Sequence, residues 1–241
     1  MLFRSDCGGY GEFMIETDHH LGRLLKHLED NGLSDNTLVV LTSDNGPEKS
    51  WKQRIDDFGH HSNGSYRGGK RDIYEGGHRV PMLARWPNGI KQPGRTSDAL
   101  VGQVDLLATV AELLGQPLPD EAAEDSQSFA SILLDPSYEH HRVPLINHGI
   151  KGEFAITASD WKWIAPRRDD DDGELYNLAS DPSESKDISS DHPNVVRRLQ
   201  NALTKIVVNG RSTPGDPQPN DTGYWNDLRW IEPSQYTSPN P

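Results

Sequence analysis

Apolar residues recur at intervals of three or four between residues 14 and 28, the spacing that places side chains on one face of an α-helix. Asn31-Gly32 follows as a left-handed helix stop. The next segment, Thr37–Thr42, is apolar through its middle rather than alternating. Such a run suits a strand buried on both faces, as in a parallel sheet covered by helices. Helix, short turn and buried strand together predict half of an α/β unit.

Weaker signals follow up to about residue 116. Residues 48–70 are polar and contain several glycines, which predicts a loop. Val80–Trp86 predicts a second strand, and Leu100–Val104 predicts a less regular one. Asp105 stands where a helix cap is expected, and the apolar helical face that follows it ends at Gly115.

The composition changes near residue 116, where prolines and an acidic run mark a linker. Beyond it, short apolar segments predict strands of an antiparallel sheet at Phe154–Thr157, Trp161–Ile164 and Glu174–Leu178. Pro193 occupies the first position of a helix that closes at Gly210. We therefore expect a larger α/β part at 1–116, a smaller α+β part at 117–211 and a proline-rich irregular tail at 212–241. The tail is expected to pack on the surface, with Trp225 and Trp230 as its candidate anchors.

Charge and cysteine content narrow the function classes. The chain has 24 Lys plus Arg against 37 Asp plus Glu, a formal net charge of −13. This acidity argues against a nucleic-acid binder, which needs basic surface. Cys7 is the one cysteine, so no intrachain disulfide forms. No apolar run reaches membrane-spanning length, and the start lacks a secretory signal, which by default indicates the cytoplasm.

Asp44-Asn45 directly follows the first predicted strand. In open α/β sheets, ligands bind at the carboxyl ends of strands, and carboxylate and amide oxygens there suit a hard cation such as Ca²⁺ or Mg²⁺. A plain turn is the alternative, which the short motif alone favours.

A basic, glycine-containing segment, Arg67–Arg71, comes later in the same loop and offers Lys70 to an anion. Between the two features, His60 is either a substrate contact or a surface histidine.

Taken in order, these motifs resemble a known family. The series comprises Ser43-Asp44-Asn45-Gly46, Arg67-Gly68-Gly69-Lys70, Glu75-Gly76-Gly77-His78-Arg79-Val80-Pro81 and Glu174-Leu175-Tyr176-Asn177-Leu178. It closely resembles the C-terminal part of formylglycine-dependent sulfatases of the arylsulfatase type. The resemblance implies an alkaline-phosphatase-like α/β sandwich, with a mixed sheet covered by helices, followed by a small antiparallel sheet with one long helix. It also implies hydrolysis of sulfate monoesters in small molecules or sulfated glycans. By the same resemblance Asp44 and Asn45 bind Ca²⁺, with Mg²⁺ less favoured, and Lys70 binds the sulfate.

The chain departs from the family pattern in two respects. The family's nucleophile is formylglycine, made from a cysteine or serine in a Cys-x-Pro-Ser-Arg segment, and the chain contains no such segment. Cys7 lacks the proline and the Ser-Arg pair, and the paired aspartates that complete the calcium site are also missing. We therefore expect the isolated chain to be inactive and to need a complementing N-terminal half.

Two alternatives to a sulfatase remain. One is a truncated, non-catalytic remnant that binds an anion or a partner. The other is a phosphoester or phosphonate hydrolase of the same superfamily, because a site for a tetrahedral oxyanion serves either element. Family members are commonly exported, so the sequence leaves the localisation open.

Overall fold

The computed structural model describes residues 4–167, 171–220, 223–224 and 228–236. The chain forms two compact units, Met1–Arg95 and Thr96–Pro241, which are described separately. The division lies before the composition change near residue 116, because the helix that precedes this change packs within the second unit. The expected three-part division of the whole protein stays a prediction. None of the helices among the described residues is long and apolar enough to cross a membrane.

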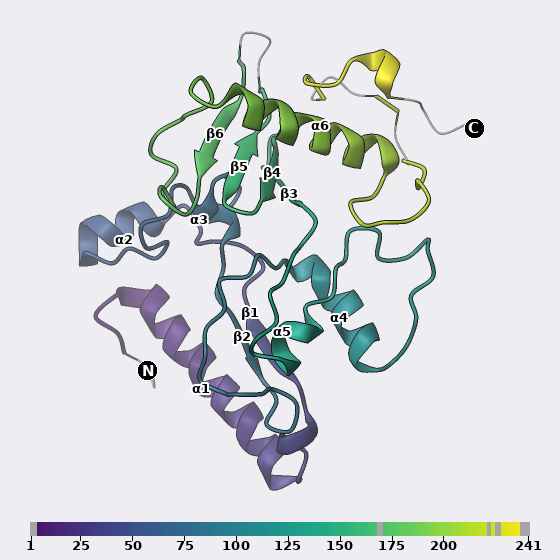
Figure 1. Cartoon of the computed structure of the whole chain (residues 1–241). Coiled ribbons are helices and arrows are strands. Elements are labelled where there is room, and N and C mark those ends of the chain that lie inside the picture. Colours follow the sequence, from purple (N-terminus) through teal and green to yellow (C-terminus); the bar gives the residue numbers. More distant parts are fainter. Residues whose placement is uncertain (1–3, 168–170, 221–222, 225–227, 237–241) are drawn as a thin grey trace. The chain divides into compact units, whose positions relative to one another are not determined.

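The first unit contains helices and one short strand pair (Figure 1). Its elements are α1 (Gly8–Asp30), a 3₁₀ turn (Ser34–Asn36), β1 (Val39–Thr42), α2 (Trp51–Phe58), α3 (Glu75–His78) and β2 (Met82–Arg85). The predicted first helix is confirmed and begins earlier than expected, at Gly8. The prediction that residues 48–70 form a loop is wrong in part, because they contain the helix α2. This helix is short and has few apolar residues.

Strand β1 pairs with β2, and the two run antiparallel, with Val39 opposite Arg85 and Thr42 opposite Met82. The expected parallel neighbour is not found among the described residues, where the sheet has only these two strands. The apolar run is therefore only partly covered. Leu41 is 36% exposed, and Leu83 on β2 is 58% exposed.

The second unit begins with helices and ends with a sheet and a long helix. Its elements are a 3₁₀ turn (Gln103–Asp105), α4 (Leu106–Leu113), α5 (Ala130–Leu134), β3 (Leu145–His148), β4 (Phe154–Ala158), β5 (Trp161–Ile164), β6 (Glu174–Asn177), α6 (Pro193–Asn209) and a last 3₁₀ turn (Pro233–Gln235).

The predicted strand at Leu100–Val104 is wrong. The Asp105 carboxylate accepts a hydrogen bond from the Gly102 N–H at 2.7 Å, which bends the chain into the 3₁₀ turn. Asp105 does not cap α4 with its side chain. Instead its carboxylate forms a buried ion pair with Arg142, at 2.6 Å.

The four strands β3 to β6 form one antiparallel sheet in sequence order, and α6 packs against β4 and β5 (Figure 1). The predicted antiparallel sheet with one long helix is thus confirmed. Helix α6 begins at Pro193 and is closed by Gly210 in the left-handed conformation, as expected. The side chains between sheet and helix form the main apolar cluster of this unit.

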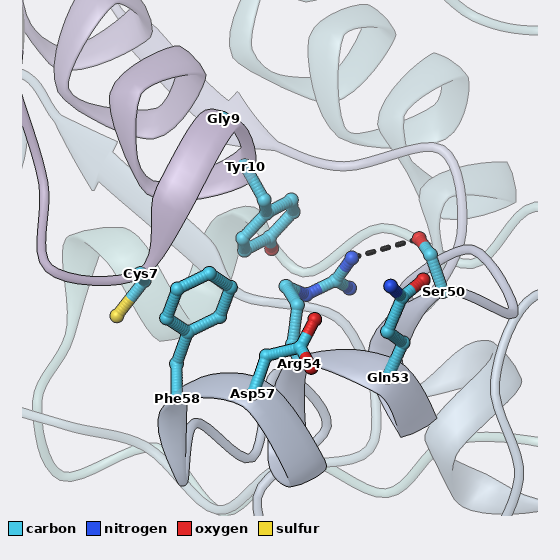
Figure 2. A pocket seen from close by; sticks show the side chains of 8 residues that line it. All are labelled: Cys7, Gly9, Tyr10, Ser50, Gln53, Arg54, Asp57 and Phe58. Atoms are coloured by element: carbon cyan, nitrogen blue, oxygen red, sulfur yellow. Dashed lines mark hydrogen bonds between the residues drawn. The ribbon is translucent and has the colours of Figure 1, made fainter.

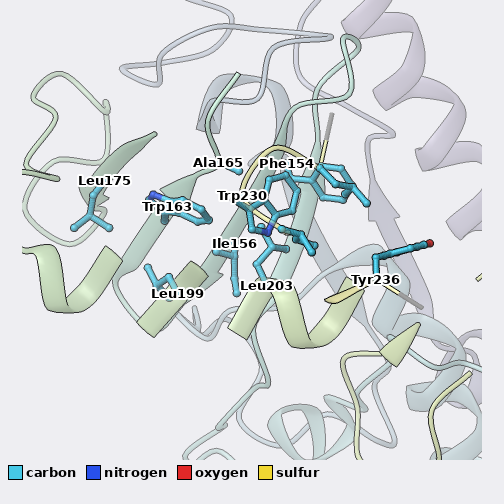
Figure 3. Packing of buried hydrophobic residues seen from close by; sticks show 11 residues of the cluster. Phe154, Ile156, Trp163, Ala165, Leu175, Leu199, Leu203, Trp230 and Tyr236 are labelled. Carbon is cyan, nitrogen blue, oxygen red and sulfur yellow. The ribbon is translucent and has the colours of Figure 1, made fainter. Parts of the chain in front are cut away.

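The C-terminal tail contributes to this cluster through Trp230, one of its two expected anchors, whereas Trp225 lies outside the described residues. Leu228, Trp230 and Ile231 are buried, and the Trp230 ring meets Phe154 with 5.0 Å between ring centroids (Figure 3). The described residues of the tail contain the 3₁₀ turn Pro233–Gln235, and their buried apolar side chains close one side of the core.

Candidate functional site

The three motifs of the first unit are held together by backbone hydrogen bonds. After β1 ends at Thr42, the Gly46 N–H donates to the Gly77 carbonyl at 2.9 Å. The Lys70 N–H donates to the Pro47 carbonyl at 2.8 Å. The turn that carries Asp44-Asn45 and the segment that carries Lys70 are therefore neighbours in space, although 25 residues separate them in sequence.

Glycines are required because these backbones touch. A Cβ on Gly46 would lie 1.8 Å from the Gly76 carbonyl oxygen, and one on Gly76 would lie 2.4 Å from the Gly68 oxygen. The Gly76 N–H also donates to the Arg67 carbonyl at 2.8 Å. No side chain fits between segments at these distances, which explains the glycine positions of the motif series.

Substitution of Gly46 by alanine should therefore destabilise the first unit by about 1–3 kcal/mol, because the new methyl group meets backbone that cannot move aside locally. The matched control is Gly22→Ala on α1, where a Cβ has nothing within 4 Å. This control should raise stability by up to about 1 kcal/mol, because alanine favours a helix over glycine. Urea unfolding of both variants tests the pair, and equal midpoints would contradict the packing argument.

Asp44 and Asn45 offer two oxygens to a cation. Asp44 is exposed, and the Asn45 Nδ2 donates to the Gly46 carbonyl at 2.9 Å, which leaves the Asn45 Oδ1 as an acceptor. Neither the Asp44 carboxylate nor that Oδ1 accepts a hydrogen bond from any residue that the structure describes. In the same residues, no three His, Cys, Asp or Glu side chains come together as a metal site. The pair thus fits part of a calcium site, which takes six to eight oxygens.

Lys70 belongs to a small basic cluster that a carboxylate partly neutralises. Its Nζ lies 3.9 Å from Glu48 Oε2, and the Arg71 guanidinium donates to Glu48 Oε1 at 2.6 Å. This hydrogen bond from Arg71 is the main reason why the pKa of Glu48 falls from its ordinary 4.5 to about 2. Glu48 could not be predicted as part of this cluster, because its role depends on a contact across 23 residues.

Replacing Arg71 with methionine should return the pKa of Glu48 towards 4.5, whereas Lys70→Met, which removes a smaller contribution, should change it less. Because the folded-state pKa is depressed, the stabilisation from this pair is complete above about pH 4.5 and is lost as pH falls through about 2. A pH titration of the Glu48 carboxyl by NMR measures this shift. An unchanged midpoint in the Arg71 variant would contradict the assignment.

His60 lies apart from this cluster. Its backbone N–H donates to the Arg54 carbonyl, and its ring stands 6.0 Å from the Tyr10 ring. Within the described residues no hydrogen bond, ion pair or ring contact joins His60 to Asp44, Asn45 or Lys70. A substrate role for His60 stays a prediction.

Comparisons with known proteins address the family directly. The family model described as Sulfatase matches residues 5–116, and the model described as N-sulphoglucosamine sulphohydrolase, C-terminal, matches residues 64–209. The N-acetylgalactosamine-6-O-sulfatase of Bacteroides thetaiotaomicron is 35% identical over an alignment of 222 residues, which covers 84% of this chain and 42% of that protein. Human arylsulfatase A is 37% identical over an alignment of 163 residues, which covers 66% of this chain and 31% of that protein.

Solved structures show the same relationship. One, from work on glycosaminoglycan metabolism by Bacteroides thetaiotaomicron, has a TM-score of 0.72 and 34% identity, covering 83% of this chain and 45% of that chain. Another, in complex with its substrate D-glucosamine-2-N,6-O-disulfate, has a TM-score of 0.65 and 27% identity, covering 81% of this chain and 39% of that chain. The chain thus spans less than half the length of each of these relatives. The family model for the C-terminal part of N-sulphoglucosamine sulphohydrolase matches 146 of the 241 residues, and the three motifs of the first unit lie within the residues that the Sulfatase model matches. The chain therefore belongs to the sulfatase family.

Proposed function

We propose that this chain supplies the cation-binding turn and the sulfate-binding lysine of an enzyme that hydrolyses sulfate monoesters. The observation that carries the proposal is the backbone hydrogen bond from Lys70 to Pro47, which joins the lysine segment to the turn that holds Asp44 and Asn45. Two hard oxygen donors and an ammonium group on neighbouring loops suit a divalent cation and the anion that it holds.

In this proposal Asp44 and Asn45 hold Ca²⁺ together with oxygens from other segments of the protein. Sulfatases typically use Ca²⁺ and formylglycine. The cation would neutralise charge on the sulfate oxygens, and formylglycine would supply the nucleophile. The sequence of this chain does not contain the Cys-x-Pro-Ser-Arg segment from which formylglycine is made.

Lys70 contacts the sulfate in the same proposal. Its pair with Glu48 is long, at 3.9 Å, and both side chains are well exposed, so an arriving sulfate displaces only a weak, solvent-screened interaction. Glu48 stays bound to Arg71, whose guanidinium it already engages at 2.6 Å. His60 remains a candidate substrate contact beyond these residues.

The proposed substrate class is a sulfated glycan. The relatives include an N-acetylgalactosamine-6-O-sulfatase and a protein solved with its substrate D-glucosamine-2-N,6-O-disulfate. Both names refer to sulfated sugars, which supports the same substrate class here.

The test combines this chain with an N-terminal sulfatase half that carries the formylglycine segment, and compares 4-nitrophenyl sulfate with 4-nitrophenyl phosphate. Ca²⁺-dependent release of sulfate in preference to phosphate is the expected result. Preference for the phosphate ester would identify the phosphoester alternative. A complex that forms and binds Ca²⁺ but hydrolyses neither ester would favour the non-catalytic alternative.

A further inference from the structure

A pocket in the first unit lies between the start of α1 and one face of α2 (Figure 2). It has a volume of about 350 Å³, within the range of small-molecule sites. Six side chains carry its chemistry, namely Tyr10, Ser50, Gln53, Arg54, Asp57 and Phe58. None of them belongs to the segments that hold Asp44, Asn45 or Lys70.

Arg54 is the unusual member of this set. It is only 7% exposed, and its guanidinium stacks on the Tyr10 ring at 4.0 Å. Its Nε donates to Ser62 Oγ and its Nη1 to Ser50 Oγ, each at 2.8 Å, whereas Nη2 has no hydrogen-bond partner. All these contacts are neutral, and no carboxylate among the described residues pairs with Arg54. A buried cation is costly without a counter-charge, so the site favours an anionic ligand.

The rest of the lining suits a sugar. Gln53 and Asp57 are exposed and carry amide and carboxylate groups that bind hydroxyls, and they flank the guanidinium in Figure 2. Tyr10 and Phe58 supply aromatic surface on the other side of the pocket (Figure 2). Asp57 disfavours a bare anion but accepts hydrogen bonds from sugar hydroxyls. The combination therefore suits a sulfate group attached to a polyol better than a free sulfate ion.

Helix α2 connects this pocket to the proposed sulfatase site. Trp51 at its start packs against the lysine segment, because a Cβ on Gly69 would lie 2.6 Å from Trp51 Nε1. Arg54 and Phe58 follow on the same helix, about 5–10 Å farther along its axis at 1.5 Å per residue. The His60 ring also stands against Tyr10 of the pocket.

We propose that this pocket binds a sulfated sugar residue next to the one whose ester is hydrolysed, with Arg54 engaging its sulfate group. The inference rests on the proposed function, which it extends from the ester bond to the neighbouring part of the glycan chain. It assigns Gln53 and Asp57 to the sugar hydroxyls.

The test uses Cys7, the only cysteine in the sequence, which also lines the pocket. Alkylation of its thiol is timed on the chain in the absence of Ca²⁺, with N-acetylgalactosamine 6-sulfate, N-acetylgalactosamine or inorganic sulfate as probe. The sulfated sugar should slow alkylation at lower concentration than either of the other two. The concentration dependence of this protection gives Kd.

Arg54→Met should raise that Kd by about 10- to 100-fold, since it removes charge-assisted hydrogen bonds to the sulfate group. Gln53 is exposed, so Gln53→Ala leaves the fold intact, and it should raise the Kd by a smaller factor. Lys52→Ala on the same helix, outside the pocket lining, and Lys70→Ala should leave the Kd unchanged.

Equal protection by inorganic sulfate would overturn the inference, and so would the absence of protection by any probe. Loss of protection in Lys70→Ala but not in Arg54→Met or Gln53→Ala would also overturn it, while leaving the proposed sulfate site in place. Failure of the esterase assay with protection intact would instead count against the proposed function alone.

Discussion

Replacing Lys162 with methionine is expected to lower the free energy of unfolding of the second unit by about 3–5 kcal/mol. Lys162 lies on β5, and its Nζ is 2.9 Å from Glu184 Oε1, with both side chains fully buried. Methionine fills a similar volume but leaves the carboxylate without its counter-charge in the core. Urea unfolding followed by the fluorescence of the buried tryptophans measures the loss.

Two further variants separate charge from packing. The double variant Lys162→Met with Glu184→Met removes both charges and should recover most of the lost stability. Lys186→Met, an exposed lysine nearby, should change stability by no more than about 0.5 kcal/mol. If the double variant is as unstable as Lys162→Met, the loss comes from side-chain shape and not from an unpaired carboxylate.

The second large effect concerns the proposed catalytic function. In the combined enzyme, Asp44→Ala should reduce kcat/KM for a sulfate ester by at least about 100-fold, because it removes a ligand of the cation that polarises the sulfate. The remaining activity should need a higher Ca²⁺ concentration. Initial rates measured over a Ca²⁺ series test both statements.

Two control variants test whether the effect is specific to Asp44 and whether it acts through the cation. Asp35→Ala removes an exposed carboxylate before β1 and should leave the rates unchanged. Lys70→Ala should lower kcat/KM without changing the Ca²⁺ dependence, since the lysine binds the anion and not the cation. An Asp44 variant with unaltered Ca²⁺ dependence would show that the turn is only structural.

Several elements could be predicted from the sequence because their signals are local. Pro193 and Gly210 bracket α6, since one suits the first turn of a helix and the other the left-handed position after it. The glycine motifs of the first unit are similarly local, and the contacts of Gly46 and Gly76 give their physical reason. The order of the motifs sufficed to recognise the family.

Other features depend on contacts that no short window contains. Helix α2 has only eight residues with few apolar positions, so its segment resembled a loop. The Asp105 carboxylate, which was expected to cap a helix, instead pairs with Arg142, and 37 residues separate the two in sequence. Strand β1 was expected to be buried because its composition is apolar, but burial requires neighbours on both sides of the sheet, and β2 is its only partner among the described residues.

The position of Leu228 and Trp230 in the core of the second unit has a consequence for biosynthesis. These side chains pack with Leu199 and Leu203 of α6, which comes earlier in the chain. Synthesis runs from the N-terminus to the C-terminus, so the sheet and α6 are made before the segment that closes this core. Until that segment packs, they expose an apolar surface that a chaperone can recognise.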